Sequence, residues 1–422
     1  MPCQKWYSLY DKVFAIRTLW EAWGKVRANG GAPGVDGQSI EAFAAHAEEN
    51  LARLHEELRT KRYRPQPVRR CWIPKASGGK RPLGVPCVRD RVVQQALRLV
   101  LEPIFEEKFL PNSHGFRPGK GAHTSISWVR RALRQGRVWV VDADIKGYFD
   151  TIPHEKVLEA VNEEIADGSV LRLLRMFLGS GVWEEGEVYE TEEGTPQGGV
   201  ISPLLANIYL HVLDKVFWEE LPGVVYVRYA DDFLVLCRSR AAAKRALEKV
   251  RAVVEGQLGL TLHPEKTRIC HLRDGFDFLG YHFELEPWQE EKGYSFTIRP
   301  RDRKVEALKA EIRRLTRRNQ GLSLKEVIRR TTRYLLGWGS YFRWSNYRQL
   351  FRTLTAWIRR RLRAYQIGRW GMAWSNRQYP NSYLEALGFV VLREGKWYEA
   401  RPVPIWARPS WKAGCERSAR PV

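Results

Sequence analysis

Residues 227–236, VRYADDFLVL, place two adjacent carboxylates, Asp231 and Asp232, inside a run of β-branched and aromatic residues. Neighbouring residues of an extended strand point to opposite faces of a sheet, so the two side chains cannot serve one site from within a strand. A tight hairpin removes this difficulty because it places the pair at the tip between two short strands. The stretch therefore predicts a hairpin with an acidic tip. An ordinary Asp-rich turn would produce the same pattern, so the pair alone does not identify a site.

A second acidic segment, VVDADIKGYFD at residues 140–150, strengthens the case. Asp142 and Asp144 lie on one face of a predicted strand by its period of two, and the chain then breaks into a loop. Metal-assisted phosphoryl transfer uses carboxylates from neighbouring strand ends to hold two Mg²⁺ ions roughly 3.5–4 Å apart. The two segments together predict such a site, although periodicity does not choose between Asp142 and Asp144.

The order of the other predicted elements indicates the fold class. Apolar spacing predicts helices over residues 88–109 and 241–258, and a third helix from Ser202 with a serine cap and proline at its first position. Strands are expected over residues 138–149, on both sides of residues 230–232, and near residues 266–285. Helices and strands mix without strict alternation, which favours an α+β fold with an antiparallel sheet over a doubly wound sheet.

Charge identifies the expected partner. The 422 residues carry a net charge of +22, and residues 299–363 hold 20 Lys and Arg against 4 Asp and Glu. Apolar residues recur there at spacings of three and four, which predicts a basic helical bundle. One of its helices is expected to begin at Ser323, with Glu326 completing a capping box. A solvated surface is the alternative, but so few balancing acids favour contact with nucleic acid.

Other compositional features exclude several protein classes. The length suggests two or three domains. No run of 18 apolar residues occurs, and the first residues lack the apolar core of a secretory signal, so we expect a cytoplasmic protein without membrane partners. The six cysteines form no C-x-x-C pair, which argues against a zinc site or a disulfide framework.

Seven ordered motifs resemble those of the mobile group II intron reverse transcriptases, also called maturases. They span residues 27–283 and read IPKASGGKRPLGVP, SHGFRPGKGAH, VVDADIKGYFD, EEGTPQGGVISPLLANIYL, YADD, LHPEKT and FLGYHF. The basic region beyond them, with LLGWGSYFRWSNY, is similar to the thumb and RNA-binding domain X of that family. The resemblance implies a right-hand polymerase with an antiparallel-sheet palm, interleaved fingers and an all-α thumb/X domain.

The resemblance also implies a domain order. We expect an N-terminal helical extension over residues 1–26, an extension loop and fingers over 27–140, a palm with remaining finger elements over 141–300, a thumb/X domain over 301–370, and a short basic, Trp-rich tail over 371–422. Many family members end with a Cys/His-rich endonuclease. The tail contains only one cysteine, so the chain is most similar to the compact bacterial class C type that lacks this domain.

Catalytic roles carry over onto matching positions. Asp144, Asp231 and Asp232 correspond to the ligands of two Mg²⁺ ions, with Mn²⁺ as an alternative, and Asp142 is left as a supporting or solvated acid. Lys266 corresponds to a lysine placed to protonate the departing pyrophosphate; an ordinary surface lysine is the alternative.

Substrate contacts carry over in the same way. The residues that match nucleotide-binding positions are Lys75, Arg81, Phe149 and Gln197. Phe149 would sit under the incoming sugar and favour deoxynucleotides, or would be a core aromatic. Expected primer or template contacts are Gly198, Gly199, Tyr281, Arg313, Arg317, Arg359 and Arg360. A loop linked to template switching matches Gly34, Val35 and Asp36.

The implied function is RNA-directed DNA polymerisation by a mobile group II intron protein that also binds the intron RNA to assist splicing and retrohoming. Its expected partners are structured intron RNA, an RNA template with a DNA primer, deoxynucleotides and target DNA, within a bacterial ribonucleoprotein. Three alternatives remain open: a domesticated relative in DNA repair or defence, a non-catalytic splicing factor, and a generic RNA-binding protein.

Overall fold

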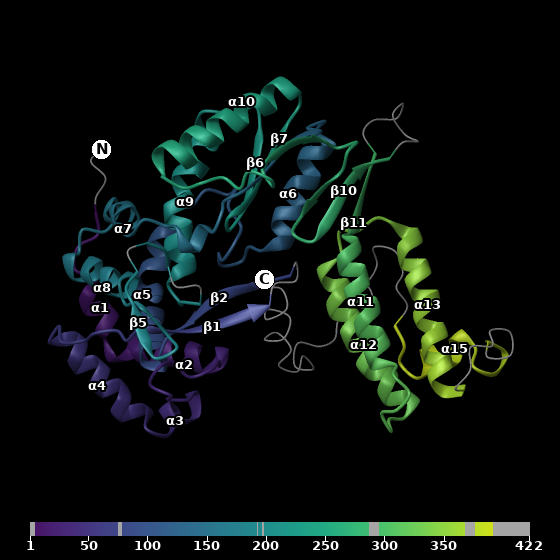
Figure 1. The fold of residues 1–422 in the computed structure, drawn as a ribbon, viewed down its shortest axis with the longest axis horizontal. Coiled ribbons are helices and arrows are strands. Elements are labelled where there is room, and N and C mark those ends of the chain that lie inside the picture. The colour runs from purple at the N-terminus through teal and green to yellow at the C-terminus, as the bar shows by residue number, and fades with distance from the viewer. Residues whose placement is uncertain are drawn as a thin grey trace. The chain divides into compact units, whose positions relative to one another are not determined.

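The computed structural model describes residues 5–74, 78–191, 193–195, 198–286, 295–367 and 376–390. These residues form two compact units (Figure 1). The first unit comprises the chain up to Ser125 together with Trp139–Ile269, and the second comprises Ile126–Val138 and the chain from Cys270 onward. Both units contain helices, and the sheets are largely antiparallel, so the α+β class predicted from the sequence is confirmed.

Helices make up most of the first unit. They are α1 (Tyr10–Phe14), α2 (Ile16–Asn29), α3 (Ile40–Ala45), α4 (Ala47–Arg59), α5 (Val88–Glu106), α7 (His154–Asn162), α8 (Gly168–Leu178), α9 (Ser202–Glu219) and α10 (Arg240–Arg251), with the short η1 (Tyr148–Asp150) and η2 (Ala252–Gln257). Helix α6 (Ala122–Arg134) begins in the first unit and continues in the second. The apolar faces of the helices other than α6 form one large core that includes residues of α5 and α9.

Two four-stranded sheets belong with these helices. One has the order β2-β1-β4-β5 and contains β1 (Val68–Pro74), β2 (Lys80–Val85), β4 (Val182–Glu184) and β5 (Glu187–Tyr189). The other has the order β6-β7-β3-β8 and contains β3 (Trp139–Asp144), β6 (Val225–Tyr229), β7 (Asp232–Cys237) and β8 (Arg268–His271).

The sheet β6-β7-β3-β8 carries the acidic segments. Strand β7 lies between β6 and β3 and pairs antiparallel with both. Helix α10 packs on β3 and β7, and α9 packs on β6. The β-branched and aromatic residues of β7 are buried from Phe233 to Cys237 because the strand is covered by helices. This enclosed central strand gives the acidic residues at its beginning a rigid support.

Two local predictions need correction. The predicted strand over residues 138–149 ends at Asp144, because Gly147 adopts a left-handed φ of 59° and the chain turns into η1. The predicted serine cap of the third helix is wrong: Ser202 is the first helical residue, Ile201 is the N-cap, and no side chain caps this end. Proline does lie in the first turn, as expected.

The second unit combines a small sheet with the basic helices. Its sheet has the order β11-β10-β9 and contains β9 (Phe276–Phe278), β10 (Tyr281–Leu285) and β11 (Phe296–Pro300), and its helices are α11 (Asp302–Leu315), α12 (Leu324–Tyr341), α13 (Arg348–Ile367) and α15 (Asn381–Ala386). The predicted apolar stripes are buried between these helices, as in Leu308, Ile312 and Val327. The predicted helical bundle is therefore confirmed.

The start of α12 matches only part of its prediction. The Ser323 hydroxyl accepts a hydrogen bond from the Glu326 N–H and caps the helix, as expected. The Glu326 carboxylate, however, forms ion pairs with Arg329 and Arg330 at 2.7 and 2.8 Å. Arg329 and Arg330 thus bind the carboxylate that a full capping box would direct to the backbone N–H of Ser323.

Two features of the part of the chain that the structure describes concern membrane-spanning helices and disulfides. No helix there is long and apolar enough to cross a membrane. Cys71, Cys87, Cys237 and Cys270 are not disulfide-bonded.

Candidate active site

The hairpin between β6 and β7 has a two-residue turn formed by Ala230 and Asp231. Tyr229 and Asp232 are the last paired residues on either side of it, which confirms the predicted hairpin. Ala230 has a φ of 56°, a left-handed conformation that an alanine adopts only under local constraint. Asp231 therefore lies in the turn itself, whereas Asp232 is the first residue of β7. Only Asp231 thus lies at the tip, whereas the sequence predicted that both carboxylates would lie there.

The end of β3 brings further carboxylates to the turn. Asp144 is the direct cross-strand partner of Asp232, while Asp142, two residues earlier, lies opposite Leu234. Burial, followed by repulsion from Asp144, raises the pKa of Asp231 to about 6. Burial and the negative charges of Asp142, Asp231 and Asp144 raise the pKa of Asp232 well above its usual range. The carboxylates are close enough to repel one another, and a cation among them would relieve that repulsion.

Basic side chains just before β8 and at its first residue meet these carboxylates. The Lys266 ammonium forms a hydrogen-bonded ion pair with the Asp144 carboxylate. Arg268 lies 3.7 Å from Asp142, and the backbone N–H of His263 donates to the Asp144 carbonyl at 2.8 Å. The predicted catalytic lysine is thus beside a predicted metal ligand, and Asp142 has a different cationic partner.

The donor set suits a hard divalent ion. Asp144, Asp231 and Asp232 offer carboxylate oxygens, the ligands that Mg²⁺ prefers. Among the described residues, no group of three or more Asp, Glu, His or Cys side chains is arranged so that it could hold a metal ion as it stands. The Lys266 ammonium forms an ion pair with one of these carboxylates, that of Asp144. The chemistry of the residues fits Mg²⁺, and a bound ion would compete with the Lys266 ammonium for the Asp144 carboxylate.

An aromatic cluster borders the carboxylates. Phe149 is half-buried and lies edge-on to Phe116, with ring centroids 6.5 Å apart, and Phe116 also contacts Tyr229 at 6.4 Å. The Phe149 carbonyl accepts a hydrogen bond of 2.6 Å from the Thr195 N–H, which ties η1 to the glycine-rich segment that follows. Phe116 was not anticipated from the sequence, where it is one residue of a glycine-containing loop.

The glycine-rich segment that contains Gly198 and Gly199 comes close to the backbone of β2. A Cβ added to Gly198 would lie 2.4 Å from the Gly84 carbonyl of β2, and Gly198 has a φ of 114°, so only glycine fits. Gly199 is buried. Arg81, also on β2, pairs in register with Ile73. Two other predicted nucleotide-binding residues, Lys75 and Gln197, lie outside the described residues.

The predicted template-switching loop is anchored on the fold. Gly34 is buried, and a Cβ there would lie 2.6 Å from the Cys87 backbone and sulfur. Arg69 donates to the Pro33 carbonyl at 2.8 Å. Asp36 is exposed at the loop surface, and Val35 is half-buried. Gly34 therefore has a packing role in the protein.

Other predicted contact residues belong to the second unit. Tyr281 is fully buried, and its hydroxyl donates to the Tyr341 carbonyl at the end of α12. Arg313, Arg317 and Arg360 are exposed, and Arg359 forms an ion pair of 2.6 Å with Glu385. The tail over residues 371–422 lies largely outside the described residues.

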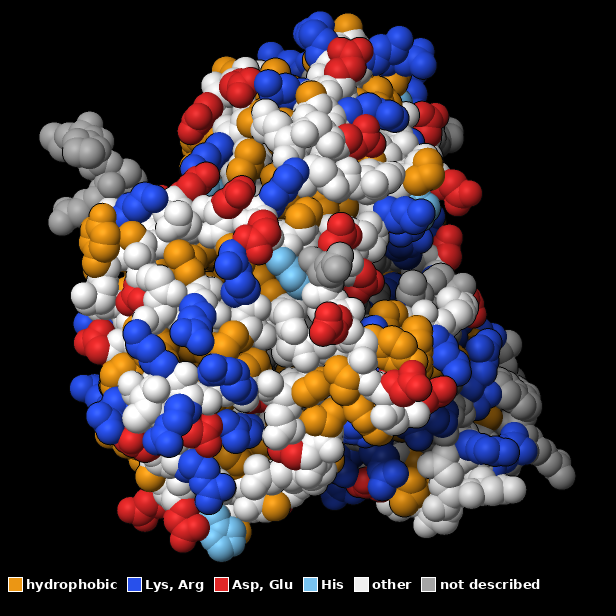
Figure 2. All heavy atoms as spheres, turned by 60° about the vertical axis from the view of Figure 1, so that its left-hand side comes forward, with side chains coloured by type: hydrophobic (Ala, Val, Ile, Leu, Met, Phe, Trp, Pro, Cys, Tyr) orange, Lys and Arg blue, Asp and Glu red, His pale blue; other side chains and the backbone are white. Residues whose placement is uncertain are grey.

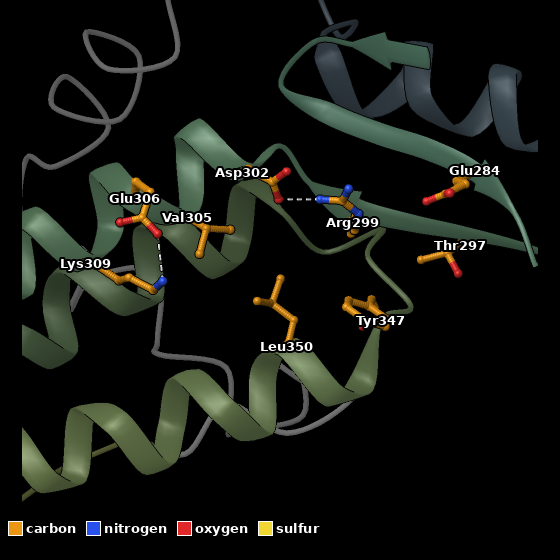
Figure 3. Close-up of a pocket in the computed structure, with 9 residues that line it drawn as sticks. All are labelled: Glu284, Thr297, Arg299, Asp302, Val305, Glu306, Lys309, Tyr347 and Leu350. Atoms are coloured by element: carbon orange, nitrogen blue, oxygen red, sulfur yellow. Dashed lines mark hydrogen bonds and ion pairs between the residues drawn. The ribbon is translucent and has the colours of Figure 1, made fainter. Parts of the chain in front are cut away.

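The second unit also contains a hollow of about 520 Å³ (Figure 3). It is lined from β10, β11, α11 and α13 by Glu284, Thr297, Arg299, Asp302, Val305, Glu306, Lys309, Tyr347 and Leu350. Arg299 pairs with Asp302 at 2.6 Å, and Lys309 pairs with Glu306 at 2.7 Å. None of the residues predicted to be catalytic lines this hollow. Elsewhere, on the face in Figure 2, Lys and Arg side chains lie among Asp and Glu side chains.

A buried polar network beneath the turn is the main feature that sequence reasoning missed. Arg228 is fully buried and forms an ion pair with Asp214 of α9, and it also contacts Asn207 of the same helix. A signal was present, because Asn207 and Asp214 are seven residues apart on an otherwise apolar helix and so share one face. Arg228 similarly interrupts an apolar strand.

Comparison with known proteins agrees with this description. Residues 73–283 match the family model "Reverse transcriptase (RNA-dependent DNA polymerase)", and residues 305–381 match "Group II intron, maturase-specific domain". Protein YkfC of Escherichia coli is 38% identical over 286 residues, covering 59% of this chain and 75% of that protein. The group II intron-encoded protein LtrA of Lactococcus lactis is 33% identical over 298 residues, covering 56% of this chain and 50% of LtrA.

A solved structure was also found. Apo telomerase from Candida Tropicalis aligns over 56% of this chain and 58% of its own, with a TM-score of 0.41 and 16% identity. That similarity is too low to support an inference about this molecule.

Proposed function

Because the chain belongs to the reverse transcriptase (RNA-dependent DNA polymerase) family and carries a group II intron maturase-specific domain, we propose that it copies RNA into DNA by extending a primer with deoxynucleotides. The observation that carries this proposal is the apposition of Asp144 and Asp232 across β3 and β7, with Asp231 in the adjoining turn. Three carboxylates at the ends of neighbouring strands are the arrangement that metal-assisted phosphoryl transfer requires.

Each residue of the site has a proposed task. Asp144, Asp231 and Asp232 would hold two Mg²⁺ ions, or Mn²⁺ in their place; when bound, such ions increase the nucleophilicity of the primer 3′ oxygen and neutralise charge on the phosphates. Lys266, which already contacts Asp144, would give a proton to the leaving pyrophosphate. Phe149 would support the deoxyribose, and Arg81, with Lys75 and Gln197, would bind the incoming nucleotide.

The basic helices supply the proposed RNA contacts. Arg313 lies on α11, Arg317 in the segment between α11 and α12, and Arg360 on α13, and all three are exposed. Exposed arginines bind phosphates strongly because their charge is always present. We propose that this surface binds the primer–template and structured intron RNA, and that the protein assists splicing and retrohoming into target DNA within a bacterial ribonucleoprotein.

Primer extension tests the polymerase proposal. The wild-type chain and the Asp231→Ala/Asp232→Ala variant are incubated with poly(rA), oligo(dT), dTTP and Mg²⁺. Extension by the wild type and none by the variant is expected. The exposed Asp11→Asn variant serves as the control and should retain wild-type activity. Failure of the wild type to extend the primer under varied salt and metal conditions would reject the polymerase proposal.

The splicing proposal needs its own experiment, because catalytic carboxylates are not required for RNA binding. The intron RNA encoded around this gene is incubated with the wild type and with the Asp231→Ala/Asp232→Ala variant, and spliced product is measured. Equal stimulation by both proteins is expected. No protein-dependent splicing would remove the maturase role and leave the polymerase proposal intact.

A further inference from the structure

Arg228 lies directly beneath the turn that carries Asp231. Its side chain is fully buried, and two of its nitrogens bind the Asp214 carboxylate, Nε at 2.7 Å and Nη2 at 2.5 Å. This bidentate contact holds the guanidinium plane in one orientation. The negative charge of Asp214 offsets the cost of burying the guanidinium, so the pair is electrically balanced within the core.

The remaining nitrogen connects the pair to the turn. Arg228 Nη1 donates to the Asn207 side-chain oxygen at 2.9 Å and to the Ala230 carbonyl at 3.0 Å. Ala230 is the residue with the left-handed φ of 56°, and its carbonyl belongs to the peptide bond that leads into Asp231. A donor fixed on that carbonyl restrains the orientation of this peptide and hence the direction of Asp231.

The loop before α6 holds the same turn from another side. Asn207 donates from Nδ2 to the Gly115 carbonyl at 2.8 Å, and a Cβ on Gly115 would lie only 2.3 Å from the Ala230 nitrogen. The backbone of Arg228 also bonds to this loop, donating to Asn112 O and accepting from His114 N, both at 2.9 Å. The turn is therefore enclosed by bonded neighbours and has little freedom to relax.

A purely stabilising role is a poor explanation for this network. A fully buried ion pair costs desolvation free energy, and well-packed apolar residues of similar volume often stabilise a core equally well. Apolar residues, however, could not donate to the Ala230 carbonyl. A strained backbone conformation at a site persists only when its surroundings determine it strongly.

We propose that Arg228, oriented by Asp214 and Asn207, is a positioning residue: it holds the Ala230–Asp231 peptide so that Asp231 and Asp232 meet Asp144 in the geometry that binds the divalent ions. The inference rests on the proposed polymerase function. It predicts that loss of the Ala230 contact weakens metal binding and turnover while substrate binding and folding are maintained.

Arg228→Lys tests this proposal most directly. Lysine keeps the positive charge beside Asp214 but cannot reproduce the planar fork that also reaches Ala230. We expect kcat in primer extension to fall by about 10- to 100-fold, as for a small misplacement of reacting groups. KM for dTTP and the primer–template Kd should remain within about twofold of wild type. The Kd for Mn²⁺, titrated by electron paramagnetic resonance with primer–template present, should rise severalfold.

A stability control separates positioning from general weakening. Leu174→Ala creates a cavity in α8, at a fully buried position in the same core that no contact above links to the turn. It should lower the melting temperature by at least as much as Arg228→Lys, yet leave kcat and the Mn²⁺ Kd unchanged. Arg228→Lys with wild-type kcat and Mn²⁺ affinity would overturn the proposal.

If Arg228→Lys does not fold, Asn207→Ser decides, because it leaves the ion pair intact but removes the amide that orients Nη1 and binds Gly115; unchanged kcat and Mn²⁺ affinity would then reject the proposal. If the wild type shows no primer extension, the proposed polymerase function is rejected. The Mn²⁺ Kd of the variant, compared with that of the wild type, then still tests the positioning role.

Discussion

Asp144 and Asp232 stand directly opposite each other in the antiparallel pair of β3 and β7. Like charges in this position repel across the short distance between paired strands, and they destabilise the sheet. The fold nevertheless places a third carboxylate, Asp231, in the adjacent turn. A protein that required only a stable hairpin would gain by replacing one of these residues.

Neutralising one member of the pair should therefore stabilise the protein while removing its activity. We expect Asp232→Asn to raise the free energy of unfolding by roughly 0.2–1 kcal/mol at neutral pH in metal-free buffer, because the cross-strand repulsion is lost. Primer extension should be abolished. Urea denaturation monitored by circular dichroism checks the first effect, with Asp274→Asn as an exposed control. A less stable Asp232→Asn variant would contradict the repulsion that the structure indicates.

Replacing Lys266 tests whether its contact with Asp144 serves catalysis. Lys266→Met should lower kcat by about 100-fold, the usual size of a general acid contribution, without changing the primer–template Kd. The Mg²⁺ concentration for half-maximal activity should also fall, since the ammonium no longer competes for Asp144. Lys244→Met, an exposed lysine of α10, is the control. Wild-type kcat in Lys266→Met would show that Lys266 is an ordinary surface lysine.

Protein stability should depend on pH through Asp90. This side chain is buried on α5, accepts hydrogen bonds from Tyr63 Oη at 2.5 Å and the Gln66 N–H at 3.0 Å, and burial raises its pKa to about 6 from an ordinary 3.8. The folded protein then holds this proton more tightly than the unfolded chain, so stability should decline as pH rises from about 4 to about 6. The expected loss from Asp90 is roughly 3 kcal/mol.

Urea denaturation at pH 4.5 and pH 7 captures about two thirds of that decline, roughly 2 kcal/mol. Asp231, whose pKa is also raised to about 6, contributes in the same window, so the difference between variants is the informative quantity. The decline should be smaller in Asp90→Asn than in the wild type, and unchanged in the exposed Asp11→Asn control. An identical decline in all three proteins would exclude Asp90 as a source.

Gly115→Ala should disturb the catalytic turn through the close approach of Gly115 to the Ala230 backbone. The added Cβ would lie 2.3 Å from the Ala230 nitrogen, so the backbone of one segment must move. We expect a loss of kcat of about 10-fold or more. Gly121→Ala in the same loop is the matched control, because nothing lies within 4 Å of its added Cβ and its φ is not left-handed. Equal kinetics for the two variants would show that the turn tolerates displacement.

Arginines of the second unit should determine how strongly RNA binding depends on salt. The logarithm of the primer–template affinity is plotted against the logarithm of salt concentration for Arg317→Gln/Arg360→Gln. The slope should decrease by about one for each phosphate contact removed. Arg329→Gln is the control, because Arg329 already pairs with Glu326 at 2.7 Å. A slope unchanged from wild type would place the RNA elsewhere on the protein.

Local patterns predicted the helices and strands well, but less well their ends. The helix spacing over residues 88–109 corresponds to α5 (Val88–Glu106), and the apolar stripes of α11 and α12 are buried as expected. One error occurred at Ser202, which is the first helical residue and not a cap; at Glu326, two arginines compete for the carboxylate. Such competition depends on neighbours that a linear pattern does not include.

The sequence by itself determined which chemistry is present: an acidic hairpin, a second acidic strand end, a cationic helical region and the ordered motifs of one family. Tertiary structure decided which carboxylates meet. Asp144 pairs with Asp232 and Asp142 does not, because strand register depends on packing between segments far apart in the chain. The support of the turn by Arg228, Asp214 and Asn207 was decided in the same way. Buried polar groups require partners, and only the folded chain determines which partners are within reach.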